Sequence, residues 1–499
     1  MLKKTEFEKS YAFFFLVLFA VYLPVLQTHY LHTDDYFWSK WGEWNYKAVL
    51  SFMGSIGRPG GAILYWAFSK IQNFRDVYLF RLLAVLNGAL IAWLLAGDLR
   101  KTGVRKEIAA LLALIVGTLP SFQIFASYVS TLPHSVSVTL ALLALRYQGR
   151  FFVSSLLLAL AFSFNQVGAL FFVVGIFTRI ILCPPHELKS FLLKGGRALF
   201  QILAAGMFVY YIVFRIYLAM THSEMGGKYD PSLFVQDYTA RARWFFNGAL
   251  FEAANLWNLH SRHLIPGILL AIFLGFWAVE ASKTPKKERK WVGFQGVFAL
   301  LCFPVGFAIS LVSLSPSLEY RTYPVLGTLC LFLPALYVYK SVASNEKRVW
   351  FMSYILLLIL FLGGTTANQA VFKFFAFPDS VEYRFVRNHI RQYLSSGKNL
   401  QWVHLIKARG PIAAPFEHHD FGEPTVRHEY NIRSFVLAAL SETSAKAPIR
   451  ITFGQDANSR NAVELLARNP DKVQFEATVH SLDSASDILI IDLTRVDLK

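Results

Sequence analysis

The chain has few cysteines and few charges. Cysteine occurs three times in 499 residues, at Cys183, Cys302 and Cys330, and each lies within or beside an apolar run. This placement excludes a disulfide framework or a cysteine-rich metal cluster. Charged residues make up 16% of the chain, against about 25% in a typical soluble domain. Since 55% of the residues are hydrophobic, the composition indicates a membrane protein.

Acidic residues are scarce relative to basic ones, with 32 aspartates and glutamates against 49 lysines and arginines. The resulting net charge of +17 could indicate nucleic-acid binding. However, the basic residues gather in short loops between apolar runs, near Arg100, Lys189, Lys286 and Lys347. This is the positive-inside pattern of multi-pass membrane proteins, so we expect no nucleic-acid partner.

Long apolar runs are abundant and alternate with basic loops, which predicts a polytopic α-helical membrane protein. We expect about eleven transmembrane helices, at residues 11–29, 77–97, 107–120, 133–147, 151–164, 167–182, 198–219, 264–281, 291–313, 322–340 and 349–365. The loop charges then place the N-terminus in the cytoplasm and the C-terminus outside. No small-residue cleavage site follows the first run, so we expect it to be an uncleaved anchor.

The character of the chain changes after about residue 366, where the charge rises and the apolar runs shorten. Short strands are predicted at 401–406, 450–453 and 487–491, with helices near 380–396 and 458–468. We therefore predict a membrane domain of residues 1–365, with outer loops at 30–76 and 220–263. A small extracytoplasmic α/β domain follows at residues 366–499. Within the first outer loop, the aromatic segment Gly60–Phe68 is too short to span and predicts an interfacial helix.

Asp34 and Asp35 directly follow the first predicted span. A carboxylate at a membrane surface can act as general base toward a sugar hydroxyl or hold a divalent cation against a phosphate. Aspartate is also a favoured helix cap, which is the structural alternative. Adjacent residues point in different directions, so the two carboxylates need not serve one site.

Arg58 and Arg321 lie on the same predicted outer face. Arg58 is in a Gly-Arg-Pro turn, and Arg321 precedes a span that begins near Pro324. A guanidinium binds phosphate oxygens in a bidentate manner, and a helix start adds free N–H groups. The alternatives are a snorkelling side chain for Arg58 and a surface ion pair with Glu319 for Arg321.

Amide and histidine side chains are weaker candidates. Asn165 and Gln166 follow Phe164 at a predicted outer membrane end, where they form either a turn or the lining of a polar cavity. His260 and His263 lack a carboxylate or other third ligand at fixed spacing, so we do not expect a metal site there, and His418-His419-Asp420 is weak for the same reason.

Taken in order, Asp34-Asp35, Gly57-Arg58-Pro59, Phe164-Asn165-Gln166 and Arg321 resemble the motifs of the GT-C superfamily of lipid-phosphate-sugar glycosyltransferases. The closest resemblance is to the bacterial GtrII-type glucosyltransferases that decorate O-antigen, although many of those have Tyr-Gln where this chain has Asn-Gln. The resemblance covers roughly residues 10–365.

The resemblance implies an inverting enzyme of the bacterial inner membrane. It would transfer a sugar, glucose in the GtrII type, from undecaprenyl phosphate to a lipopolysaccharide glycan at the periplasmic face. Asp34 or Asp35 would be the base, and Arg58 and Arg321 would bind the donor phosphate. Other substrate contacts are implied for Tyr36, Asn165, Gln166 and Glu319. Some members need Mg²⁺ or Mn²⁺, which Asp34 and Asp35 would then bind; the sequence does not decide between these cases.

The alternative function is a transporter or flippase of lipid-linked sugars. Transporters also have many spans, but they carry charged residues along a path through the membrane. Here the unusual polar residues lie on the predicted outer face, and the chain shows no repeated halves. These features favour the transferase.

Overall fold

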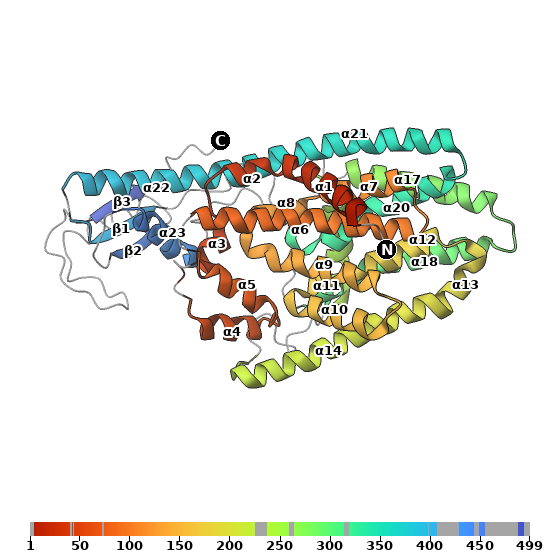
Figure 1. Cartoon of the computed structure of the whole chain (residues 1–499), viewed down its shortest axis with the longest axis horizontal. Helices are drawn as coiled ribbons and strands as arrows, with labels where there is room; N and C mark the ends of the chain where they lie inside the picture. Colours follow the sequence, from red (N-terminus) through yellow and green to blue (C-terminus); the bar gives the residue numbers. More distant parts are fainter. Residues whose placement is uncertain are drawn as a thin grey trace. The chain divides into compact units, whose positions relative to one another are not determined.

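The structure is a computed structural model that describes residues 4–39, 42, 44–71, 74–224, 237–258, 264–313, 319–397, 399–406, 429–443, 449–454 and 488–493. It is mainly helical, with one small sheet (Figure 1). The chain forms two compact units. The helical unit comprises Met1–Leu26, Asn45–Trp66 and Tyr78–Val371, and the α/β unit comprises Gln27–Trp44, Ala67–Val77 and Phe372–Lys499.

The longer helices and the short ones that carry the site are bounded as follows: α1 (Lys4–Val21), α2 (Leu23–Gln27), α3 (Thr33–Trp38), α4 (Tyr46–Ser55), α5 (Gly61–Phe68), α6 (Phe74–Lys101), α7 (Lys106–Val116), α8 (Pro120–Ser127), α9 (Leu132–Arg146), α10 (Phe151–Phe164), α11 (Gln166–Ala169), α12 (Phe172–Leu182), α14 (Arg197–Thr221), α15 (Tyr238–Trp244), α17 (Leu264–Lys283), α18 (Arg289–Gly306), α20 (Pro324–Val342), α21 (Glu346–Val371), α22 (Phe377–Ser395) and α23 (Glu429–Ser441).

Six helical segments of the described residues are long and apolar enough to cross a membrane: Asp76–Lys101, Val129–Arg146, Pro185–Thr221, Leu264–Lys283, Pro324–Val342 and Glu346–Ser395. Helices α7 and α8 make a seventh if the pair, bent by 62°, counts as one span. Pro120 begins α8 and lacks the N–H that would continue α7, which accounts for the break. The chain is thus a helical, multi-pass membrane protein.

The six long helices coincide with predicted spans, and the bent pair covers the predicted span at 107–120. The other four predictions fall on helices that do not meet this test. For example, α10 has 14 residues, or about 21 Å at 1.5 Å per residue, whereas a bilayer core is about 30 Å thick. The total of eleven spans therefore stays a prediction.

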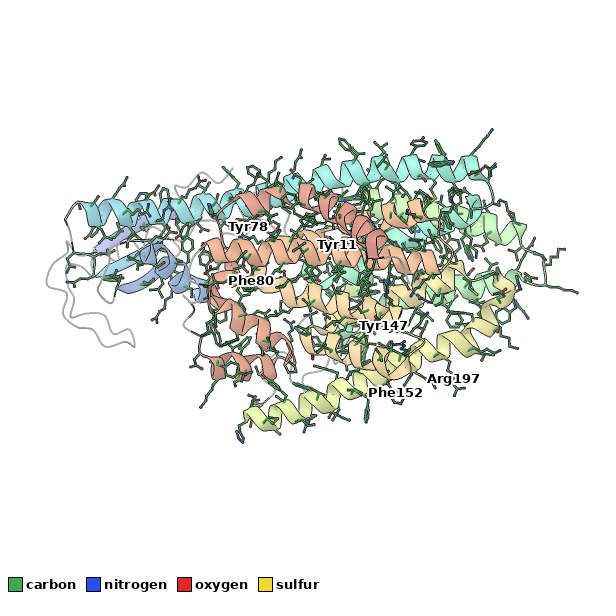
Figure 2. All side chains as sticks on the ribbon, in the orientation of Figure 1. Tyr11, Tyr78, Phe80, Tyr147, Phe152 and Arg197 are labelled. Atoms are coloured by element: carbon green, nitrogen blue, oxygen red, sulfur yellow. The ribbon has the colours of Figure 1, made fainter. Side chains whose placement is uncertain are left out.

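Several helices expose wide apolar surfaces, as expected where lipid chains are the solvent. In the most apolar 18-residue stretch of α17, 6% of the residues are buried. Phe152 on α10 is 84% exposed (Figure 2). By contrast, 78% of the residues are buried in the most apolar stretch of Val129–Arg146, and 72% in that of α20. Helix α9 packs against α10, which also packs against α14, and α20 packs against α12 and α17 (Figure 1). Helices α9 and α20 therefore form the interior of the helical unit.

The α/β unit contains a parallel sheet in the order β2-β1-β3, formed by β1 (Trp402–Ile406), β2 (Arg450–Gly454) and β3 (Ile488–Asp492). These strands confirm the three predicted ones to within one residue at each end. Helix α22 packs against β3, and α23 packs against β2 and α22. Helix α22 also confirms the helix predicted near 380–396, whereas the one predicted at 458–468 lies outside the described residues.

The loop predicted at 30–76 is shared by the two units. Residues Asn45–Trp66 belong to the helical unit, whereas Gln27–Trp44 and Ala67–Val77 belong to the α/β unit. Within the latter, α3 packs against α23, and the ring of Tyr36 meets that of Phe435 edge-on at 5.1 Å. The segment that carries the aspartate pair is therefore part of the α/β unit.

Candidate functional site

The aspartate pair lies in the first turn of α3, where its two carboxylates have different surroundings. Asp35 is completely buried, and its Oδ2 accepts a hydrogen bond from the backbone N–H of His32 at 3.3 Å. This is the reach-back contact of a capping box, so the helix-cap alternative describes Asp35. Asp34 is only half-buried. Of the two residues, Asp34 is therefore the more exposed.

His32 holds the start of α3 within the α/β unit. Its buried ring lies with Nδ1 2.7 Å from Oδ2 of Asp379 on α22 and meets the ring of Phe375 edge-on. Burial lowers the pKa of His32, but the charge and hydrogen bond of Asp379, together with Asp35 and Asp34, outweigh it and raise the pKa overall. Sequence reasoning missed Asp379 because it lies 347 residues away along the chain.

A divalent cation at the aspartate pair would need further ligands. No group of three or more histidine, cysteine or acidic side chains suited to a metal ion occurs in the described part of the chain. The carboxylate of Asp35 also already accepts the His32 N–H. Among the described residues, the donor set therefore does not form a cation site by itself.

In the helical unit, Gln166 fixes the turn that carries Arg58. The backbone oxygen of Gly57 accepts hydrogen bonds from the Gln166 side-chain amide and from the hydroxyl of Tyr210, the latter at 2.7 Å. Gly57 has a φ of 71°, which favours glycine, and a Cβ there would lie 2.9 Å from Nε2 of Gln166. Gln166 and Tyr210 therefore position the residue next to Arg58.

Asn165 starts the short helix α11. Its Oδ1 accepts a hydrogen bond from the Gly168 N–H at 2.9 Å, as an N-cap residue does. The side chain is completely buried, and Nδ2 has no hydrogen-bond partner in the structure. The Oδ1 of Asn165 thus has the structural role that was expected as the alternative, in a turn. Its Nδ2 is a buried hydrogen-bond donor without a partner among the described residues.

The positive charges of Arg58 and Arg321 both act on a residue that sequence reasoning missed, His134 on α9. His134 is 6% exposed, and the buried Nε of Arg58 has no hydrogen-bond partner among the described residues. The sequence did contain a signal for His134, because it is an ionisable residue inside the predicted span 133–147. Such residues are costly in a membrane and commonly functional.

Arg321 is held by its neighbour Glu319. The Nε of Arg321 lies 2.6 Å from Oε2 of Glu319, and both side chains are about one-quarter exposed, at 25% and 23%. The surface ion pair expected as the alternative is therefore present. Nearby, the hydroxyl of Ser121 donates to the backbone oxygen of Tyr320 at 2.6 Å, which fixes this segment to α8.

The candidate residues thus fall into two groups. Asp34, Asp35 and Tyr36 lie in the α/β unit, and the others lie in the helical unit, namely Arg58, Asn165, Gln166, Glu319 and Arg321. The pairs His260/His263 and His418/His419 lie outside the described residues. In comparisons with known proteins, no family model, no curated protein and no solved structure matches the chain.

Proposed function

We propose that this protein is an inverting glycosyltransferase of the GT-C type, which moves a sugar from a polyprenyl phosphate to a cell-surface glycan. The observation that carries the proposal is that two guanidiniums within a unit of apolar helices, those of Arg58 and Arg321, both act on the buried ring of His134. Guanidiniums bind phosphate oxygens in a bidentate manner. The apolar helix surfaces suit the lipid chain that carries the phosphate.

In the proposed reaction, the Asp34 carboxylate takes the proton of an acceptor hydroxyl as its oxygen attacks the anomeric carbon. The new glycosidic bond forms while the bond from that carbon to the phosphate oxygen breaks, with inversion. The electron pair of the broken bond stays on the lipid phosphate, whose charge Arg58 and Arg321 stabilise. Asp34 is the proposed base because this residue is half-buried, whereas Asp35 is buried and its carboxylate caps α3.

The remaining residues position these groups. Gln166 holds the turn next to Arg58 through the Gly57 oxygen, and Glu319 orients Arg321 through its Nε. Direct contacts of Tyr36, Asn165, Gln166 and Glu319 with substrate remain part of the proposal. We also propose undecaprenyl-phosphate-glucose as the donor and O-antigen as the acceptor. The proposed location is the bacterial inner membrane, with a cytoplasmic N-terminus and a periplasmic α/β unit.

The phosphate site predicts a selective loss of donor binding in Arg58→Gln and Arg321→Gln. A charge-assisted hydrogen bond contributes about 1.5–3 kcal/mol, so each variant should bind undecaprenyl-phosphate-glucose at least about tenfold more weakly. Binding of the acceptor glycan should change less. Titration of purified protein in detergent with donor, and separately with acceptor, measures both.

Arg197→Gln is the matched control, because Arg197 is an exposed arginine at the start of α14 (Figure 2). It should leave donor affinity unchanged. Equal donor affinity in the wild type and in both site variants would reject the phosphate role. A larger loss of acceptor binding than of donor binding would also reject it.

A further inference from the structure

The helical unit contains a cavity of about 1130 Å³ away from the proposed transfer site. Helices α1, α7 and α21, which pack against one another (Figure 1), contribute residues to its lining, as do the C-terminal ends of α6 and α9. Its apolar wall is largely aromatic, with Phe13, Phe14, Trp93, Leu111, Trp350 and Tyr354. Neither Arg58, His134 nor Arg321 lines it, so it is a separate cavity.

Four cationic side chains line the same cavity, those of Arg100, Lys101, Lys106 and Arg146. The one acidic side chain in the lining, Glu107, contacts Arg105 at 3.8 Å. Nearby Asp98 is bound by Arg179 through both carboxylate oxygens, at 2.7 and 2.9 Å. The lining therefore carries a net charge of +3, from four positive charges and one negative charge.

None of these four cations forms an ion pair within the described residues. Lys101 donates to the backbone oxygen of Arg146 at 3.3 Å, and the Arg146 guanidinium lies 4.9 Å from the centre of the Trp93 ring. These contacts place two of the cations beside each other and against the aromatic wall. Mutual repulsion among like charges makes a bound anion favourable there.

We propose that this cavity binds an anionic phospholipid of the surrounding bilayer. The phosphate head would lie on the four cations, which offer charge-assisted donors, and an acyl chain would lie against the aromatic wall. A volume of about 1130 Å³ exceeds that of most small-molecule pockets, which reach roughly 1,000 Å³. A basic pocket between apolar helices is a setting in which a lipid head with two phosphates binds. Cardiolipin is therefore the probe of choice.

The test is native mass spectrometry of the delipidated full-length protein titrated with cardiolipin. The triple variant Arg100→Gln/Lys106→Gln/Arg146→Gln should bind cardiolipin at least tenfold more weakly than the wild type. A matched triple variant at other exposed basic positions, Lys286→Gln/Lys287→Gln/Lys290→Gln, should bind like the wild type. Phosphatidylcholine, which has no net charge, should bind neither protein tightly.

Three results would overturn the proposal. The first is equal cardiolipin affinity in the wild type and the cavity triple variant. The second is competition by inorganic phosphate at the same concentration, which would indicate a site for free anions. The third is a preference for undecaprenyl phosphate over cardiolipin, which would assign the cavity to the carrier lipid. If the triple variant does not fold, the single variant Lys106→Gln, changed at an exposed position, should show a smaller loss in the same direction.

Discussion

Asp34 and Asp35 are neighbours in sequence but differ in what their carboxylates can reach. The carboxylate of Asp35 is buried and accepts the His32 N–H, whereas Asp34 is a half-buried residue. A general base must come within hydrogen-bond distance of the proton that it removes. Exposure therefore favours Asp34 as the base and leaves Asp35 to hold the first turn of α3. The motif alone could not separate these roles, because the difference arises from packing inside the α/β unit.

The two aspartates should accordingly respond differently to replacement by asparagine. Asp34→Asn should abolish sugar transfer with an unchanged melting temperature, because the amide cannot accept the proton. Asp35→Asn should lower the free energy of unfolding by about 1 kcal/mol, as the loss of a capping interaction does. Turnover and thermal melts of the purified variants measure the two effects. Wild-type turnover in Asp34→Asn would contradict the assignment.

At the scale of elements, strands and caps follow from local sequence, whereas contacts between distant elements do not. The β-branched and aromatic runs predicted β1, β2 and β3 to within a residue, because strand propensity is read over a few neighbours. The Gly57 turn was also recognisable. The contact between His32 and Asp379, and the effect of the Arg58 and Arg321 charges on His134, depend on tertiary packing that no short segment encodes.

The pKa values of two histidines in the α/β unit are shifted in opposite directions. Burial lowers the pKa of His404 on β1 to about 4, below the unfolded value of about 6.5. Between these two values the unfolded chain binds a proton that the folded unit excludes, so stability falls as the pH drops through this window. His32 has a raised pKa. Its contribution is present below about pH 6.5 and is lost as the pH rises through its folded pKa.

Replacing His404 should therefore flatten the acid side of the stability profile. A shift of this size corresponds to at most about 3 kcal/mol, lost as the pH falls from 6.5 to 4. His404→Gln removes the titrating ring, so its melting temperature should fall less than that of the wild type over this range. Thermal melts at several pH values provide the measurement. Parallel pH profiles for the two proteins would show that His404 does not control the loss.

At the scale of the whole molecule, composition was sufficient to indicate a helical membrane protein. Six predicted spans coincide with long apolar helices. The remaining predicted spans include short helices such as α10, because apolar content alone does not show whether a helix crosses a bilayer or ends within the protein. The division of the 30–76 loop between two units was not predictable either, since it depends on which distant elements each part contacts.

The central claim is that this molecule transfers a sugar from a polyprenyl phosphate. The most direct measurement is release of undecaprenyl phosphate from undecaprenyl-phosphate-glucose by the purified full-length protein with an acceptor glycan. We predict release by the wild type and by Arg197→Gln, and none by Asp34→Asn. Donor binding by the wild type without any release, with intact folding and acceptor present, would contradict it and favour a transporter of lipid-linked sugars.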